Sequence, residues 1–162
     1  MKIFKDNSGR EWKVSITVEA VKRVRSLCGV NLLDIIKIDD NKVTADLLDQ
    51  LTTDPVLLVD VIFCICRPQA EEADVSDVEF GESMVGDTVE AATTALMEEL
   101  INFFPEAKKK ILRLILDTGN RIKHQALQTV DRLLASPELE KAISQLENDV
   151  SKPSITSPGS AE

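Results

Sequence analysis

The sequence predicts a mainly α-helical fold, a helical bundle around a buried central helix at about residues 55–66, with a short N-terminal β-hairpin at about residues 2–18. The central stretch, PVLLVDVIFCIC, is apolar at ten of twelve positions, and a helix that is apolar on every side is buried on every side. Over much of the remaining chain, apolar residues recur at spacings of three and four, the period of one helix face. Near the N-terminus they alternate instead, as in a strand with one buried face.

The predicted hairpin combines a turn with an alternating second strand. The turn-forming residues Asp-Asn-Ser-Gly at 6–9 follow the short apolar run Ile3-Phe4. From Trp12 to Val18, apolar residues alternate with polar ones. Because an isolated hairpin is only marginally stable, we expect it to lie on the helices or to pair with another chain by strand addition.

Two helices are predicted before the central one. Thr17 is a suitable N-cap for a helix over about 18–28, and Gly29 is a suitable C′ residue for it. Thr44 is the predicted N-cap of a short helix that carries Leu47, Leu48 and Leu51. Between the two helices, the sequence predicts a helical turn at 32–36 and a loop at Asp39-Asp40-Asn41.

The ends of the central helix follow from its flanking residues. Asp54 is a good N-cap and Pro55 suits the first helical position, whereas Arg67-Pro68 is expected to end the helix. A length of about 18 Å falls short of the ~20 residues that a membrane crossing needs, and a buried strand is the competing interpretation. If the helix is buried all round, its one charged residue, Asp60, must pair with an Arg or Lys from the basic segments.

Two capping-box patterns mark the helices that follow Pro68. Ser76 with Glu79 matches one box, and Asp87 with Glu90 matches a second. The second box is predicted to open a helix over about 88–104, which ends there because a proline follows at 105.

The C-terminal third is predicted to be helical and then flexible. Residues 106–135 are amphipathic, and Gly119-Asn120 either breaks this segment into two helices or permits a close contact within one. A polar helix over about 137–149 completes a single domain at 1–150, and the polar residues 151–162 are expected to form a flexible tail. The apolar stripe of the amphipathic segment consists of Ile111, Ile115, Ile122, Ala126, Val130 and Leu133.

The composition bounds the class of function. A formal charge of −9 and an aromatic content of 4% argue against a nucleic-acid-binding protein. Residues 38–104 carry two Lys or Arg against sixteen Asp or Glu. Either this segment complements the basic segments 1–37 and 105–135 within the fold, or it forms an acidic face for a basic partner.

The residues that usually carry chemistry are scarce. Three cysteines and the absence of a signal-peptide pattern predict reduced thiols in a cytoplasmic protein rather than a disulfide framework. Cys64-x-Cys66 lacks the spacing of a zinc or redox motif, and two thiols at i and i+2 of a helix point apart. The single histidine, His124, is expected at the surface, and catalysis by a buried Asp60 is the least favoured alternative. We therefore expect a non-enzymatic binding protein with no metal and no cofactor.

The order of features along the chain resembles a known family. A Trp-bearing N-terminal hairpin (Glu11-Trp12-Lys13-Val14) precedes a helical core, and the segment GDTVEAA at 86–92 then runs to LINFFP at 100–105. A charged helix and a polar tail follow. Over roughly residues 2–135, this architecture resembles the small, mostly helical tail assembly chaperones of long-tailed phages.

The resemblance implies a role in the host cytoplasm without enzymatic activity. Such chaperones bind the long, helical tape measure protein, keep it soluble and help tail tube subunits polymerise around it; self-association is a further expectation, and neither membrane nor nucleic-acid contacts are expected. Trp12, Phe103 and Phe104 are the candidate partner-binding residues, with an ordinary core role as the competing interpretation. The alternative functions are a structural or connector protein of a phage particle, and an acidic regulator that binds a basic protein.

Overall fold

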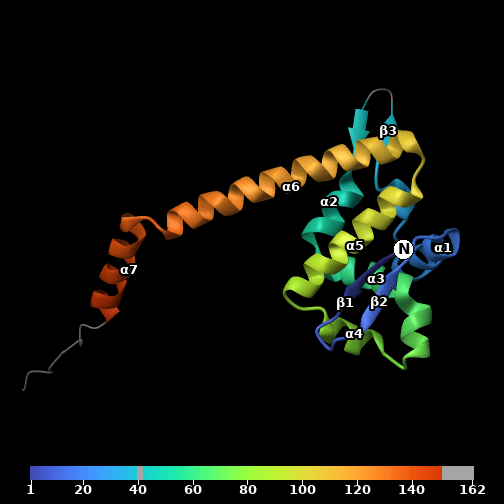
Figure 1. Cartoon of the computed structure of the whole chain (residues 1–162), viewed down its shortest axis with the longest axis horizontal. Helices are drawn as coiled ribbons and strands as arrows, with labels where there is room; N and C mark the ends of the chain where they lie inside the picture. Colours follow the sequence, from blue (N-terminus) through green and yellow to red (C-terminus); the bar gives the residue numbers. More distant parts are fainter. Residues whose placement is uncertain (40–41, 151–162) are drawn as a thin grey trace, which may run out of the picture. The chain divides into compact units, whose positions relative to one another are not determined.

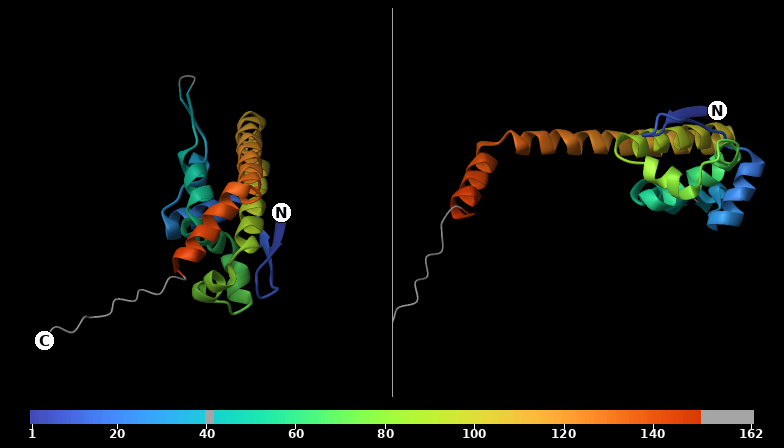
Figure 2. Two further views of the ribbon diagram at one scale, coloured as in Figure 1. Left: turned by 90° about the vertical axis from the view of Figure 1, so that its left-hand side faces the viewer. Right: turned by 90° about the horizontal axis from the view of Figure 1, so that it is seen from below.

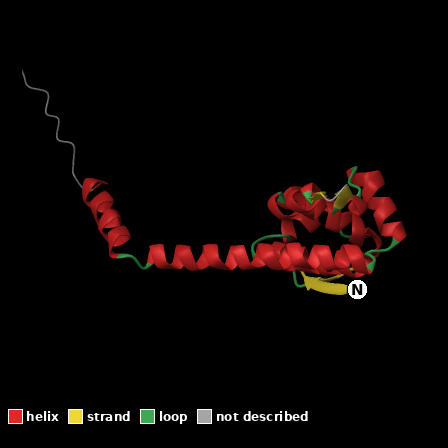
Figure 3. Ribbon diagram, turned by 90° about the horizontal axis from the view of Figure 1, so that it is seen from above, coloured by secondary structure: helices red, strands yellow, loops and turns green. Residues whose placement is uncertain are grey.

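The computed structural model describes residues 1–39 and 42–150, with side chains described as far as residue 146. Within these ranges it contains seven α-helices, one short 3-10 helix and two β-hairpins (Figure 3). This confirms a mainly α-helical fold with a short N-terminal hairpin. The sequence predicts one domain over 1–150, whereas contacts divide the chain into two units, Met1–Leu114 and the chain from Ile115 onward. The predicted tail at 151–162 lies outside the described residues.

The N-terminal hairpin pairs β1 (Lys2–Lys5) with β2 (Glu11–Val14) in antiparallel register, with Phe4 opposite Trp12. The inward side chains of this hairpin are fully or almost fully buried. The hairpin contacts α3 (Pro55–Glu72) and α5 (Asp87–Phe103), which supply the cover that two isolated strands lack (Figure 1).

Helix α1 (Val18–Cys28) begins and ends where the sequence predicts. The Thr17 side chain accepts a hydrogen bond from the Ala20 N–H at 3.1 Å, which satisfies one of the free donors of the first turn. Gly29 follows with a φ of 69°, the left-handed conformation that favours glycine at this position. Val21 and Val24 are buried and face the core.

A second hairpin, not predicted from the sequence, lies between α1 and α3. After a 3-10 turn, η1 (Leu32–Asp34), strands β3 (Lys37–Asp39) and β4 (Lys42–Thr44) pair antiparallel and lead into α2 (Asp46–Thr53) (Figure 2). The predicted loop at Asp39-Asp40-Asn41 lies partly outside the described residues. The prediction that Thr44 caps α2 is wrong, because Thr44 pairs with Lys37 in β4 and Ala45 takes the N-cap position.

Helix α3 begins as predicted and ends later than predicted. The Asp54 carboxylate accepts hydrogen bonds from the Val56 and Leu57 N–H groups at 3.0 and 3.1 Å. The helix then continues through Pro68 to Glu72, so the predicted end at Arg67-Pro68 is wrong. Gln69 explains the extension, because its side-chain amide bonds both the N–H and the C=O of Lys13 in β2, at 2.9 and 2.8 Å, and holds the last turns of α3 against the hairpin.

The central position of α3 is confirmed, but its burial on every side is not. It contacts α1, α2, α4 (Asp77–Ser83), α5 and β2. However, Val56 is 69% exposed and Asp60 lies on the same open face. The condition on which Asp60 was expected to need a basic partner is therefore not met, because water solvates an exposed carboxylate.

The two predicted capping boxes have different outcomes. At α4, the Ser76 hydroxyl accepts from the Glu79 N–H at 3.2 Å and the Glu79 carboxylate accepts from the Ser76 N–H at 2.9 Å, which confirms the first box. The second box is wrong: Gly86, with a φ of 58°, is the N-cap of α5, and Asp87 is already helical. This helix ends at Phe103, next to the predicted end at residue 104.

Helix α6 (Glu106–Leu134) is continuous, so Gly119-Asn120 does not break the amphipathic segment into two helices. Apart from the neighbouring residues and the backbone of α6 itself, no atom lies within 4 Å of the place where a Gly119 side chain would begin, so this glycine permits no close contact either. Helix α7 (Pro137–Val150) follows, with bounds close to the prediction.

Candidate protein-binding surface

The three aromatic residues predicted to contact a partner lie mostly in the core. Trp12 is 2% exposed, and its ring packs edge-on against Phe80 with centroids 4.9 Å apart. Phe104 is 7% exposed and contacts the half-buried Phe103, whose ring centroid lies 5.6 Å away. The Lys108 ammonium covers the Phe104 ring at 5.3 Å. Trp12 and Phe104 therefore offer almost no side-chain surface to a partner in this conformation.

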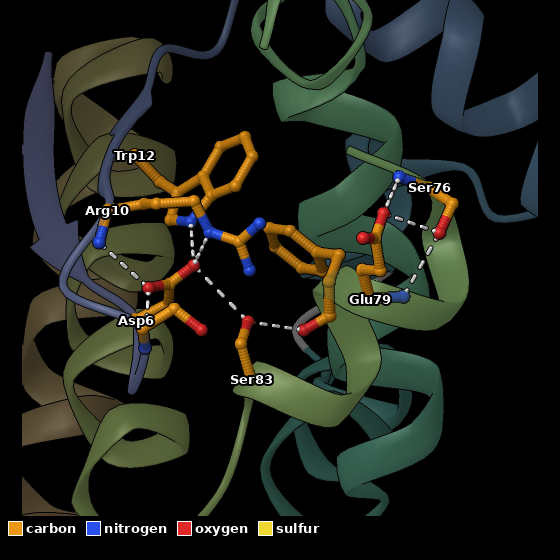
Figure 4. Close-up of polar contacts among 8 residues, drawn as sticks. Asp6, Arg10, Trp12, Ser76, Glu79 and Ser83 are labelled. Atoms are coloured by element: carbon orange, nitrogen blue, oxygen red, sulfur yellow. Dashed lines mark hydrogen bonds and ion pairs between the residues drawn. The ribbon is translucent and has the colours of Figure 1, made fainter. Parts of the chain in front are cut away.

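The most concentrated polar cluster surrounds Asp6, whose side chain is fully buried (Figure 4). Its Oδ1 accepts from the backbone N–H groups of Ser8 and Arg10, both at 2.9 Å. Its Oδ2 accepts from Arg10 Nε at 2.7 Å, from Trp12 Nε1 at 2.9 Å and from the Ser83 hydroxyl at 3.3 Å. Burial alone would raise the pKa of Asp6, but the hydrogen bonds from Trp12 and Arg10 outweigh it and hold this pKa below its usual value.

This cluster has a structural role. Both carboxylate oxygens of Asp6 already accept hydrogen bonds, and the Asn7 N–H also donates to the Ser83 carbonyl at 3.0 Å. The turn of the hairpin is thus bonded to the end of α4. The turn at residues 6–9 is predictable from the sequence, but the burial of the Asp6 carboxylate was not predicted. The sequence does contain a signal for this bonded carboxylate: two side-chain donors, Arg10 and Trp12, follow Asp6 just beyond the turn.

The remaining candidate groups are the thiols of Cys64 and Cys66 and the imidazole of His124. The two thiols of Cys64-x-Cys66 point apart as predicted, because Cys66 Sγ donates to the Lys13 carbonyl at 3.8 Å while Cys64 Sγ lies beside Cys28. His124 is exposed, also as predicted. Among the described residues, no group of three His, Cys, Asp or Glu side chains is placed to hold a metal ion. The same part of the chain contains no helix with the length and apolarity of a membrane span.

A group of exposed apolar side chains lies in the second unit, on α6 beyond Ile115 and on α7. All side chains of residues 121–135 are exposed. Seven large apolar side chains here are between 49% and 66% exposed. We call them the distal apolar face: Ile122, Leu127, Val130, Leu133 and Leu134 on α6, and Ile143 and Leu146 on α7.

The distal apolar face has the geometry of a helix-docking surface. Ile122, Val130 and Leu133 recur at multiples of three and four residues, which places them on one side of α6. Gln128 lies on the opposite side by the same spacing rule, because none of its neighbours three and four residues away belongs to the face. Within the second unit these apolar side chains remain exposed, so α6 and α7 do not cover each other there. An amphipathic helix from a partner fits such a surface.

The sequence identified the stripe on α6 but not its exposure. Ile122, Ala126, Val130 and Leu133 belong to the predicted apolar stripe. Periodicity reports that a helix has an apolar side, not what covers that side. Leu127, Leu134, Ile143 and Leu146 complete the face.

The acidic segment is partly paired with the basic N-terminal segment and partly exposed. Lys2 Nζ lies 2.6 Å from Glu98, and the N-terminal amine lies 2.6 Å from Glu99, which supports complementarity between segments. The Glu98 carboxylate raises the pKa of Lys2 through a hydrogen bond and its charge. Between residues 71 and 90, eight acidic side chains are exposed: Glu71, Glu72, Asp74, Asp77, Glu79, Glu82, Asp87 and Glu90.

Comparisons of the chain with models of known protein families, with curated proteins and with solved structures find no match.

Proposed function

We propose that this chain is a non-enzymatic assembly chaperone that binds an amphipathic helix of a tape measure protein and aids assembly of the tail tube around it. The observation that carries the proposal is the distal apolar face, a set of large apolar side chains that the second unit leaves in water. The resemblance in element order to phage tail assembly chaperones supports the same function and supplies the class of partner.

Covering exposed apolar side chains supplies the free energy for binding a partner helix. Complete burial of one Leu or Ile side chain contributes roughly 1.5–3 kcal/mol. The seven side chains of the distal apolar face are about half exposed, so a docked helix gains roughly half of that value for each one it covers. Part of the gain is offset by the loss of motional freedom on association. A monomer that keeps such a face in water is suited to a partner with a matching apolar stripe.

Co-expression with a tape measure protein from the same genome tests the proposal. We expect a soluble complex that co-purifies with this chain, and tape measure protein that precipitates when expressed alone. The proposal fails if the two proteins never co-purify and the solubility of the tape measure protein is unchanged. Mass spectrometry of finished particles separates a chaperone from a connector protein, because a chaperone is absent from the mature tail.

The exposed acidic side chains between residues 71 and 90 favour a second candidate function, an acidic regulator of a basic protein. Binding through these charges should weaken steeply between low and high salt, because exposed charges are screened over about 10 Å at 0.1 M salt. Binding through the distal apolar face should change little. A salt titration of the captured complex therefore distinguishes the two surfaces.

A further inference from the structure

The three cysteines are not equivalent in the fold. Cys28, the last residue of α1, lies with its Sγ 2.7 Å from the Sγ of Cys64 in the middle of α3. Cys66, two residues further along, turns its Sγ away toward the backbone of the first hairpin. Cys28 is partly exposed, whereas Cys64 and Cys66 are buried.

The distance between the Cys28 and Cys64 sulfurs is close to that of a covalent pair. A disulfide bond is about 2.05 Å long, so the two sulfur atoms need to move by only about 0.7 Å to form one. The two helices that carry them also contact each other. Cys66 lacks a comparable neighbour because its contact is a carbonyl oxygen.

We propose that Cys28 and Cys64 are a modification site, a thiol pair that peroxide converts into a disulfide joining α1 to α3. The partly exposed Cys28 reacts first: its thiolate attacks one oxygen of hydrogen peroxide, the O–O bond breaks, and a sulfenic acid and a hydroxide form. The Cys64 sulfur then attacks the Cys28 sulfur, the S–S bond forms, and the S–O bond breaks with release of a second hydroxide. The two thiol protons convert both hydroxides into water.

The reactivity of Cys28 sets the conditions under which this pair is oxidised. Burial is the largest cause that raises the pKa of Cys28 to about 12. The hydrogen bond and charge of Cys64 and the charge of Asp60 raise it further. Burial likewise raises the pKa of Cys66 to about 12, so the nearness of a second sulfur, and not a difference in pKa, distinguishes Cys28 from Cys66. At neutral pH the thiolate is scarce, and the pair stays reduced until peroxide is supplied. This inference is independent of the proposed function.

Peroxide treatment of the folded, full-length chain tests the site. We expect a mass loss of two hydrogen atoms without a covalent dimer, and a fall from three titratable thiols to one after unfolding. Trypsin should release the Cys28 peptide joined to the peptide that contains Cys64. The Cys66→Ser variant should form the same cross-link, whereas Cys28→Ser and Cys64→Ser should not.

Three results would overturn the proposal. They are the absence of any intramolecular cross-link in the wild-type chain, a cross-link that persists in Cys64→Ser, and a product that consists only of covalent dimers. Because the wild-type and Cys66→Ser chains must give a positive result, misfolding of a variant cannot imitate success. Dithiothreitol should restore all three thiols, which distinguishes a disulfide from irreversible oxidation.

Discussion

The substitution Asp6→Asn should destabilise the first unit far more than its small chemical change suggests. Asn keeps the shape of the side chain and leaves one oxygen for the Ser8 and Arg10 backbone donors. It replaces Oδ2 with an amide NH₂, which faces the Arg10 and Trp12 side-chain donors that Oδ2 now accepts from. Neither of these two side chains has an acceptor to offer in return.

The magnitude follows from the exposure of the two stranded donors. Trp12 is 2% exposed, so its Nε1–H cannot reach water, and an unsatisfied buried donor costs about 1–3 kcal/mol. The Arg10 side chain is 31% exposed and regains water at a smaller cost. We expect Asp6→Asn to lower the free energy of unfolding by about 2–4 kcal/mol in total.

Urea unfolding monitored by Trp fluorescence measures this value, because Trp12 is the only tryptophan and reports on the first unit. Asp60→Asn is the matched control: it makes the same chemical change at an exposed carboxylate and should change the stability by no more than about 0.5 kcal/mol. The reasoning is refuted if both variants unfold within about 0.5 kcal/mol of the wild-type chain. As a second check, circular dichroism can follow Asp6→Asn in a Trp12→Phe background, where the substitution should cost less because the indole donor is gone.

Three further predictions concern the first unit. The fold lowers the pKa of Asp6, so its contribution to stability is complete above the unfolded pKa of about 4 and is lost as the pH falls through the lower folded pKa. The free energy of unfolding should therefore fall less steeply with acidification in Asp6→Asn than in the wild-type chain. Ser76→Ala removes the hydroxyl of the capping box with Glu79 and should cost about 1 kcal/mol in urea unfolding, and an unchanged midpoint would contradict the cap. Oxidation that joins Cys28 to Cys64, 36 positions apart, should raise the free energy of unfolding by about 4 kcal/mol, a gain that Cys66→Ser keeps and Cys64→Ser loses.

Local signals in the sequence predicted the elements whose ends are set locally. Thr17, Gly29, Asp54 and the Ser76–Glu79 box all act as caps in the structure because each acts on backbone groups within a few residues. The first hairpin was also predictable, since its turn residues and its alternation agree.

Tertiary contacts explain the errors. Pro68 ends an isolated helix, but here Gln69 ties the following turn to Lys13, 56 residues away, and no local rule anticipates that bond. The contact between Cys28 and Cys64 is likewise set by the packing of two helices that are distant in sequence. The strands of the second hairpin have three residues each, too short for alternation to identify.

For the candidate binding surface, helix α6 and its apolar side were predictable from the sequence, but the exposure of that side was not. Trp12 was predicted as a contact residue, and large aromatic side chains are enriched at interfaces. In the structure its indole N–H donates to the Asp6 carboxylate and its ring packs on Phe80. Ile122 and Leu133 have the same periodicity as a core stripe, and only the structure shows that they are each 60% exposed.

The affinity of the full-length chain for the tape measure protein, with and without the distal apolar face, tests the central claim most directly. The double variant Ile122→Gln, Leu133→Gln removes two exposed apolar side chains without changing the charge. The control variant Gln128→Asn makes an uncharged substitution on the side of α6 that carries none of the apolar side chains of the face. We predict that the first variant weakens binding by about 1.5–3 kcal/mol, roughly 10- to 140-fold in Kd, and that the control leaves it unchanged. Equal affinities for the wild-type chain and both variants would contradict the claim that this face binds the partner.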